Sequence, residues 1–146
     1  MSLSKQPVVW VHADCLSPTN PALMKYPGAP ALFVWDDELL TEWRISFKRI
    51  VFIYECILEL PVVIRRGDVV SELLAFAAEQ RADSIVTNPS PSPRFKAISS
   101  RIAAKLPLQV VPVAPFVRPS APLDLGRFSR YWRSVEADAM RPPDEA

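Results

Sequence analysis

Four polar residues follow short apolar segments of this 146-residue sequence, and they are the residues best placed to bind a ligand. They are His12, Asp14, Asp36 and Asn88. The segments before them are short, apolar and rich in β-branched residues, which is typical of buried parallel strands. In open parallel sheets, ligands bind beyond the carboxyl ends of the strands, near the point where the strand order reverses. The four residues therefore predict a ligand site at the carboxyl edge of a sheet.

The chemistry open to these residues is binding rather than catalysis. His12 and Asp14 have the side chains of an acid–base pair, and Cys15 adds a thiol beside them. Successive side chains of an extended segment point to opposite sides, which argues against convergence of the three on one substrate. Asp36–Glu38 could bind a divalent cation through carboxylate oxygens, but three acids at the start of a helix are expected to complement its dipole instead.

Several common kinds of site are excluded by residue counts. His12 is the only histidine, and Cys15 and Cys56 are far apart with no CxxC pair, so neither a metal site nor a disulfide is expected. The three glycines are widely spaced, which excludes GxGxxG and P-loop phosphate motifs.

The composition is that of one globular domain: 49% of the residues are apolar and 23% are charged, with 17 Lys and Arg against 16 Asp and Glu. This balance predicts neither a membrane nor a nucleic-acid partner. The basic segment 89–123 is expected to be a solvated surface, with phosphate binding as the alternative. Met1–Lys5 lacks the apolar core of a signal peptide, so a cytoplasmic location is expected.

Strand-like and helical segments alternate, which predicts an α/β fold with a doubly wound sheet of five parallel strands, in the order 2-1-3-4-5 or 3-2-1-4-5. The expected strands are 7–11, 31–35, 62–65, 84–87 and 109–113. The expected helices are 41–58, one beginning after Asp68 and one beginning after Ser92. Gly67 is expected to supply a turn conformation, and Arg65 or Arg66 to pair with a carboxylate.

Two segments carry more apolar surface than one sheet requires. Ile50–Leu58 is apolar on more than one face; burial under the sheet is the expected reason, and a contact with another chain is the alternative. The α/β domain is expected to span 1–116, and 117–146 to form a Pro-rich linker followed by an amphipathic helix over 127–140. That helix carries an aromatic group, Phe128–Trp132, which is a second candidate contact.

Four segments occur in the order and spacing of a known family. Trp10–Leu23 is similar to the motif Trp-Phe-Arg-Arg-Asp-Leu-Arg-x-x-Asp-Asn-x-Ala-Leu, with matches at Trp10, Asp14, Asn20, Ala22 and Leu23. The others are Arg49–Leu60, Val63–Asp68 and Gly126–Arg133. Together they resemble the Rossmann-like N-terminal α/β domain of the DNA photolyase and cryptochrome family.

The resemblance implies a domain that holds an antenna chromophore, such as a flavin, deazaflavin or pterin, which passes excitation to FAD in a helical domain. The sequence ends before any counterpart of that FAD-binding domain, so no DNA repair is expected of it alone. The three arginines of the family motif are replaced here by His12, Ala13 and Leu16. Pro89 stands where an acidic residue often follows the Asn in the family. These differences count against a pterin.

Two other functions remain open. One is a non-enzymatic interaction module, a homodimer or the subunit of a separate partner, formed through Ile50–Leu58 and Phe128–Trp132. The other is an enzyme of the wider nucleotide-binding α/β group, which includes universal stress proteins and adenylyl-transferring families. The HxGH-type and glycine-rich ATP loops of those enzymes are missing from the sequence.

Overall fold

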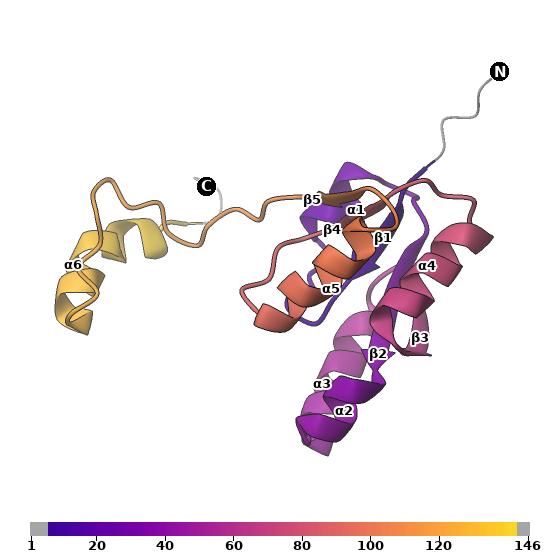
Figure 1. Cartoon of the computed structure of the whole chain (residues 1–146). Coiled ribbons are helices and arrows are strands. Elements are labelled where there is room, and N and C mark those ends of the chain that lie inside the picture. Colours follow the sequence, from indigo (N-terminus) through magenta and orange to yellow (C-terminus); the bar gives the residue numbers. More distant parts are fainter. Residues whose placement is uncertain (1–5, 143–146) are drawn as a thin grey trace. The chain divides into compact units, whose positions relative to one another are not determined.

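The computed structural model describes residues 6–142 and contains a sheet of five parallel strands. The strand order is β3-β2-β1-β4-β5, which is the second of the two predicted orders (Figure 1). The strands are β1 (Val8–Val11), β2 (Ala31–Asp36), β3 (Val63–Gly67), β4 (Ile85–Thr87) and β5 (Leu108–Val110). The predicted fold class, a doubly wound parallel α/β sheet with a C-terminal helix, is confirmed.

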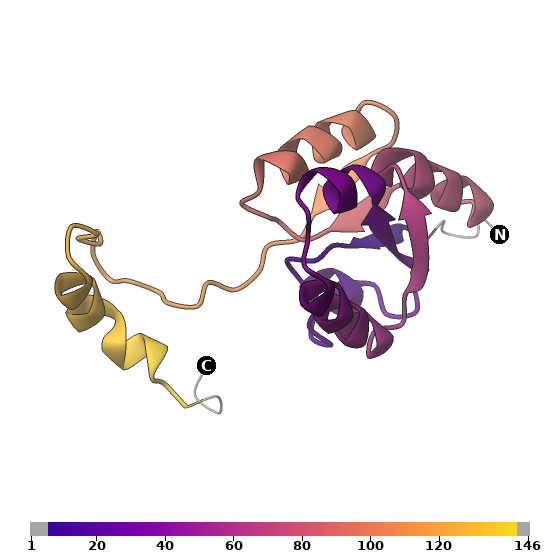
Figure 2. The same ribbon diagram turned by 90° about the horizontal axis from the view of Figure 1, so that it is seen from below.

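The helices cover both faces of the sheet, because the right-handed connections run in one direction from β1 to β3 and in the other from β3 to β5. The helices α1 (Pro21–Lys25) and α3 (Phe47–Leu58) supply buried residues to one core layer, together with α1–β2 loop residues and β1 and β2. The helices α4 (Val69–Glu79) and α5 (Pro93–Ala103) supply the other core layer and lie on one side of the strands in Figure 2. The short α2 (Asp37–Glu42) follows β2 directly.

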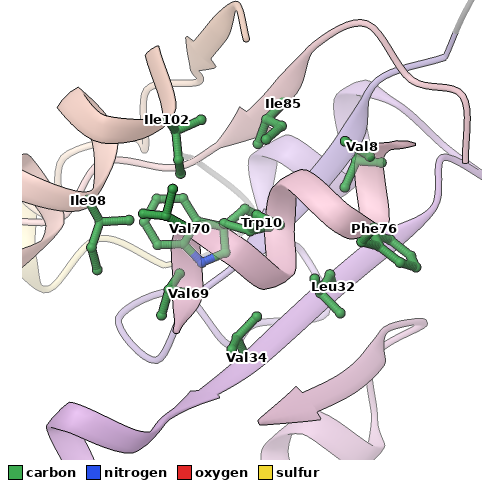
Figure 3. Close-up of a cluster of buried hydrophobic side chains, with 12 residues drawn as sticks. Val8, Trp10, Leu32, Val34, Val69, Val70, Phe76, Ile85, Ile98 and Ile102 are labelled. Carbon is green, nitrogen blue, oxygen red and sulfur yellow. The ribbon is translucent and has the colours of Figure 1, made fainter. Parts of the chain in front are cut away.

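Alternate residues of the central strands enter the two layers, because successive side chains of a strand point to opposite faces. Val8 and Trp10 of β1 pack in the layer beneath α4 and α5, whereas Val9 and Val11 pack in the other. Figure 3 shows the first layer, with Trp10 among aliphatic side chains from both helices. Its labelled members are Val8, Trp10, Leu32, Val34, Val69, Val70, Phe76, Ile85, Ile98 and Ile102.

The single helix predicted over 41–58 is wrong, because the chain breaks there into α2 and α3. Trp43 ends α2, and Arg44 adopts a left-handed φ of 42°, which no helix continues. Ser46 then begins α3, and its side chain accepts a hydrogen bond from the Arg49 backbone N–H at 3.4 Å. The five-residue α1, capped by Asn20, had no counterpart among the predicted helices.

The expected burial of Ile50–Leu58 under the sheet is also wrong for half of the helix. Ile53 and Ile57 are buried, but Phe52 and Leu58 are 63% and 61% exposed. A single layer of strands can cover only one side of a helix, so the second apolar side of α3 faces solvent.

A second compact unit begins at Ala114. It contains a Pro-rich segment and the helix α6 (Phe128–Ala139), which lies where a helix over 127–140 was predicted. Inside this unit Phe128 stacks on Trp132 with ring centroids 5.9 Å apart, and the Asp138 carboxylate accepts a hydrogen bond from the Arg118 backbone N–H. Among residues 6–142, no helix combines the length and apolar character needed to cross a membrane.

Candidate functional site

A cleft of about 500 Å³ lies at the carboxyl ends of β1 and β2. Its volume falls within the roughly 300 to 1,000 Å³ that is usual for small-molecule sites. Its walls combine apolar and aromatic side chains with a smaller number of polar ones. The aromatic members are Trp10, Phe33, Trp35, Trp43 and Phe95, and the polar members are His12, Asp14, Asp36, Arg44, Ser46, Arg49, Ser90, Ser92 and Arg94.

The His12 ring lies in the cleft wall with both of its nitrogens occupied. Nε2 is 2.8 Å from the Asn88 carbonyl oxygen, which can only accept, so Nε2 carries the proton. Nδ1 accepts a hydrogen bond from the Asp14 backbone N–H at 3.3 Å. The rings of Trp10 and Phe95 lie edge-on to His12, with centroids 5.5 and 5.3 Å away. Burial lowers the pKa of His12, against the opposing effects of the Asn88 carbonyl and Asp14, so the ring is a neutral hydrogen-bonding group at pH 7.

The Asp14 carboxylate accepts a hydrogen bond from the Ser90 hydroxyl and forms none with the imidazole. His12 and Asp14 therefore do not form an acid–base pair through their side chains. Burial, followed by the charge of Asp14, raises the pKa of the Cys15 thiol, which disfavours the nucleophilic thiolate. This arrangement supplies hydrogen-bonding groups rather than a nucleophile and its base.

Asn88 is buried directly behind the cleft wall. Its Nδ2 donates to the Val111 carbonyl oxygen at 3.1 Å, and its own carbonyl holds His12. Its Oδ1 has no partner among the described residues. Asn88 is not one of the residues that line the cleft, so its place in the structure is that of a support for His12.

Asp36 begins α2 and is bound on both oxygens. Oδ1 accepts from the backbone N–H groups of Glu38 and Leu39 at 3.0 and 3.4 Å, and Oδ2 pairs with the Arg94 guanidinium. Arg94 also pairs with Glu38 at 3.1 Å, while Asp37 pairs with Arg66. Asp36 caps α2, and Asp37 and Glu38 lie in its first turn, the position expected of acids that complement the helix dipole. Burial lowers the pKa of Arg94, whose side chain is only 20% exposed.

The predicted turn after β3 is also confirmed in its details. Gly67 has a φ of 151°, and Asp68 caps α4 by accepting from the Ser71 backbone N–H at 2.9 Å. Arg65 pairs with Glu79, as expected of one of the two arginines. These contacts are structural and lie outside the cleft.

The sequence prediction missed the residues between α2 and α3 that form the outer wall of the cleft. Trp43, Arg44 and Ser46 lie there, Arg49 follows in the first turn of α3, and Trp43 is 64% exposed. Within residues 6–142, neither Arg44 nor Arg49 takes part in an ion pair. Ser46 is a residue type that commonly begins a helix and stands directly before the apolar residues of α3, and this signal could have revealed the break.

The strand order reverses between β1 and β4, and contacts from three positions cross this boundary. The Thr87 hydroxyl donates to the Trp10 carbonyl oxygen at 2.8 Å, and the contacts of His12 with Asn88 and of Ser90 with Asp14 follow beyond the strand ends. The crevice usual at such a switch point is therefore bridged, and the open space lies beside it, over β1 and β2.

The donor set of the cleft suits an organic ligand better than a metal ion. Over residues 6–142, no three His, Cys, Asp or Glu side chains gather in a way that could hold a metal. Aromatic rings provide flat apolar contact, while Arg44 and Arg49 provide positive charge at the same wall. The arrangement can bind a flat molecule that carries an anionic group.

Comparison with known proteins relates the fold to solved structures and to no sequence family. No protein-family model matches the chain, and no curated protein matches it by sequence. A bacterial class III photolyase from Agrobacterium tumefaciens is similar over the whole chain, with a TM-score of 0.62 and 20% identity. The chain spans about a third of that photolyase, since the match covers 34% of it. A hypothetical protein whose biochemical function was assigned from its structure matches 77% of this chain and 99% of its own, with a TM-score of 0.44 and 14% identity. The chain thus has the Rossmann-like α/β fold found in part of that photolyase.

Proposed function

We propose that this chain is a photolyase-type N-terminal domain that binds a small planar chromophore or nucleotide-like ligand in the cleft over β1 and β2. DNA repair is not assigned to these residues by themselves. The observation that carries the proposal is the cleft itself, about 500 Å³ in volume and walled by five aromatic rings at the ligand-binding edge of the fold. The sequence resemblance and the fold shared with a photolyase support the choice of a flavin or deazaflavin over other ligands, and the replaced arginines make a pterin the least favoured of the three antenna chromophores.

The exposed ring of Trp43 is the side chain best placed to stack on such a ligand. It is 64% exposed although it lines the cleft, so it can cover a flat ring without first leaving a packed core. Trp10 and Phe95 differ, because they already stack on each other with centroids 5.4 Å apart. Trp43 therefore supplies an exposed aromatic surface, and Trp10 with Phe95 supplies a packed one.

The charge of the cleft favours a ligand with a phosphate or carboxylate group. Arg94 is neutralised by Asp36 and Glu38, but Arg44 and Arg49 keep their charge for a ligand. Asp14 and Ser90 also line the cleft, where they can accept or donate hydrogen bonds to a polar ring edge.

The test is titration of the full chain with FMN, a deazaflavin, a folate and AMP, followed by ligand absorbance and calorimetry. Trp43→Ala should weaken binding about fivefold or more, the usual range for loss of an aromatic stack. Phe52→Ala is the matched control, because Phe52 is equally exposed, at 63%, but does not line the cleft. No binding of any of the four ligands by the wild-type chain, or equal losses in the two variants, would contradict the proposal.

A second function, that of a non-enzymatic interaction module, is favoured by the exposed apolar side of α3. It is compatible with ligand binding, because the cleft-lining residues Arg49 and Ile53 lie on a different side of that helix.

A further inference from the structure

The helix α3 has two apolar sides, and the sheet covers only one. Ile53 and Ile57 are buried, whereas Phe47 and Leu58 are 78% and 61% exposed. The exposed apolar residues Phe47, Val51, Tyr54 and Leu58 form a stripe along the helix. Exposure of this much contiguous apolar surface is unfavourable in water and marks a contact site.

The spacing of the stripe is that of a helix-to-helix contact. Its members are separated by four, three and four residues, which is the a and d pattern by which two helices pack against each other. The twelve residues of α3 make a helix about 18 Å long, so the stripe runs along almost its full length. The feature that fits this stripe is another helix with a complementary stripe.

The charges beside the stripe identify that helix. Lys48 and Glu55 are seven residues apart, so they flank the stripe on the same side, with the base in the first half of α3 and the acid in the second. Both are exposed, and neither forms an ion pair within residues 6–142. Two copies of α3 placed antiparallel bring Lys48 beside Glu55 of the partner subunit, and the reverse pair forms at the same time. In a parallel arrangement the two copies of this charged side would lie on opposite sides of the helix pair, so Lys48 and Glu55 would meet no charged partner.

We propose that α3 forms the contact of a homodimer, in which the α3 of a second copy of this chain packs antiparallel along the stripe. The arrangement is isologous, since each copy uses the same surface and the contacts occur twice about a two-fold axis. Phe47 lies against Leu58 of the partner subunit, and Val51 against Tyr54 of the partner subunit.

The dimer is expected to be weak and to leave the cleft open. A pair of helices this short buries less than the roughly 1,200 to 2,000 Å² of stable interfaces, so dissociation in the micromolar range is expected. Arg49 and Ile53, which line the cleft, lie on another side of α3, about 100° or more around the helix from the centre of the stripe. Ligand binding and dimer formation can therefore be tested separately.

The experiment is sedimentation velocity of the full chain over a range of about 5 to 500 μM, which brackets the weak affinity expected of a small interface. The wild-type chain should shift from monomer to dimer, and Val51→Glu should remain monomeric. Lys48→Glu and Glu55→Lys should each weaken the homodimer about threefold to tenfold, because like charges then face each other twice. The double variant with both changes should recover wild-type association.

Mixing the two single variants gives the sharpest result. The Lys48→Glu chain has acids at both positions and the Glu55→Lys chain has bases at both, so the mixture should form a heterodimer tighter than either homodimer. Met24→Glu, at a residue that is 65% exposed on α1, is the control for an unrelated surface charge. Circular dichroism checks that each variant is folded. A wild-type chain that stays monomeric at the highest concentration overturns the proposal, as does a dimer that is indifferent to Val51→Glu or a mixture that shows no preference.

Discussion

The contact between Asp36 and Arg94 is predicted to hold the start of α2 against the start of α5, and a double-mutant cycle can measure it. The Asp36 side chain is 8% exposed and that of Arg94 is 20% exposed, so the pair is screened far less than a surface ion pair. Asp36→Asn keeps an acceptor for the cap of α2 and removes the charge. Asp36→Ala removes both.

The expected losses follow from these separate roles. Asp36→Asn should lower the free energy of unfolding by about 2 kcal/mol, the usual value of a hydrogen bond to a charged group. Asp36→Ala should cost about 1 kcal/mol more, which is the typical contribution of an N-cap. Arg94→Met keeps the apolar stem, and we expect it to cost about 1 to 2 kcal/mol, since Glu38 as well as Asp36 loses its partner. The double variant Asp36→Asn/Arg94→Met should show a coupling of about 1 to 2 kcal/mol.

Urea unfolding followed by circular dichroism gives all four free energies. Losses for Asp36→Asn and Arg94→Met that add to within about 0.5 kcal/mol would refute a direct pair. Equal stability of the Asp36→Asn and Asp36→Ala variants would refute the capping role. Either result would mean that the Asp36–Arg94 contact does not stabilise the cleft in the way described above.

Three further predictions concern pH, packing and backbone conformation. Burial lowers the pKa of His12 from 6.5, so below pH 6.5 the unfolded chain takes up a proton that the folded chain excludes. The free energy of unfolding should therefore decrease as the pH is lowered, by at most about 1.4 kcal/mol per pH unit from this residue. Urea unfolding between pH 7 and 5 should show a shallower pH dependence for His12→Gln than for the wild-type chain. Ile57→Ala should cost about 2 to 4 kcal/mol and Leu58→Ala less than about 0.5 kcal/mol in dilute solution, because the first residue is 1% exposed and the second 61%; similar losses would show that the helix is rotated from its described orientation. Gly67→Ala should lower the free energy of unfolding by about 1 to 3 kcal/mol, since the alanine would have to adopt a φ of 151° and its β-carbon would lie 3.1 Å from Oε1 of Glu72. An unchanged melting curve would contradict the described turn.

The sheet could be predicted from the sequence because its signals are local. The strands β1, β2 and β4 are short, mainly apolar runs bounded by turn or helix-start residues, and Asp68 and Ser92 stand directly before α4 and α5. The strands β3 and β5 also carry polar residues and begin with an apolar one. Pattern alone left two strand orders open, since the choice depends on which strand β1 lies beside after the crossover.

The cleft could be predicted only in part, because its outer wall depends on a break that the apolar pattern hides. Apolar residues continue through positions 41–58 with helical spacing, so the left-handed turn at Arg44 interrupts no visible periodicity. The role of Asn88 as a support for His12 could not be predicted from the sequence either. Its backbone carbonyl binds His12 across 76 positions of the chain, and a backbone acceptor leaves no trace in residue type.

The bridged boundary between β1 and β4 bears on how a ligand would enter and leave. The two halves of the sheet meet at this boundary, and hydrogen bonds made by Thr87, His12 and Ser90 join them at the carboxyl end. A motion that separates the halves would break all three hydrogen bonds, so we do not expect the sheet to open at this boundary. The segment Trp43–Ser46 lies outside the sheet and carries the exposed ring of Trp43, so we expect this wall, rather than the sheet, to move when a ligand enters the cleft.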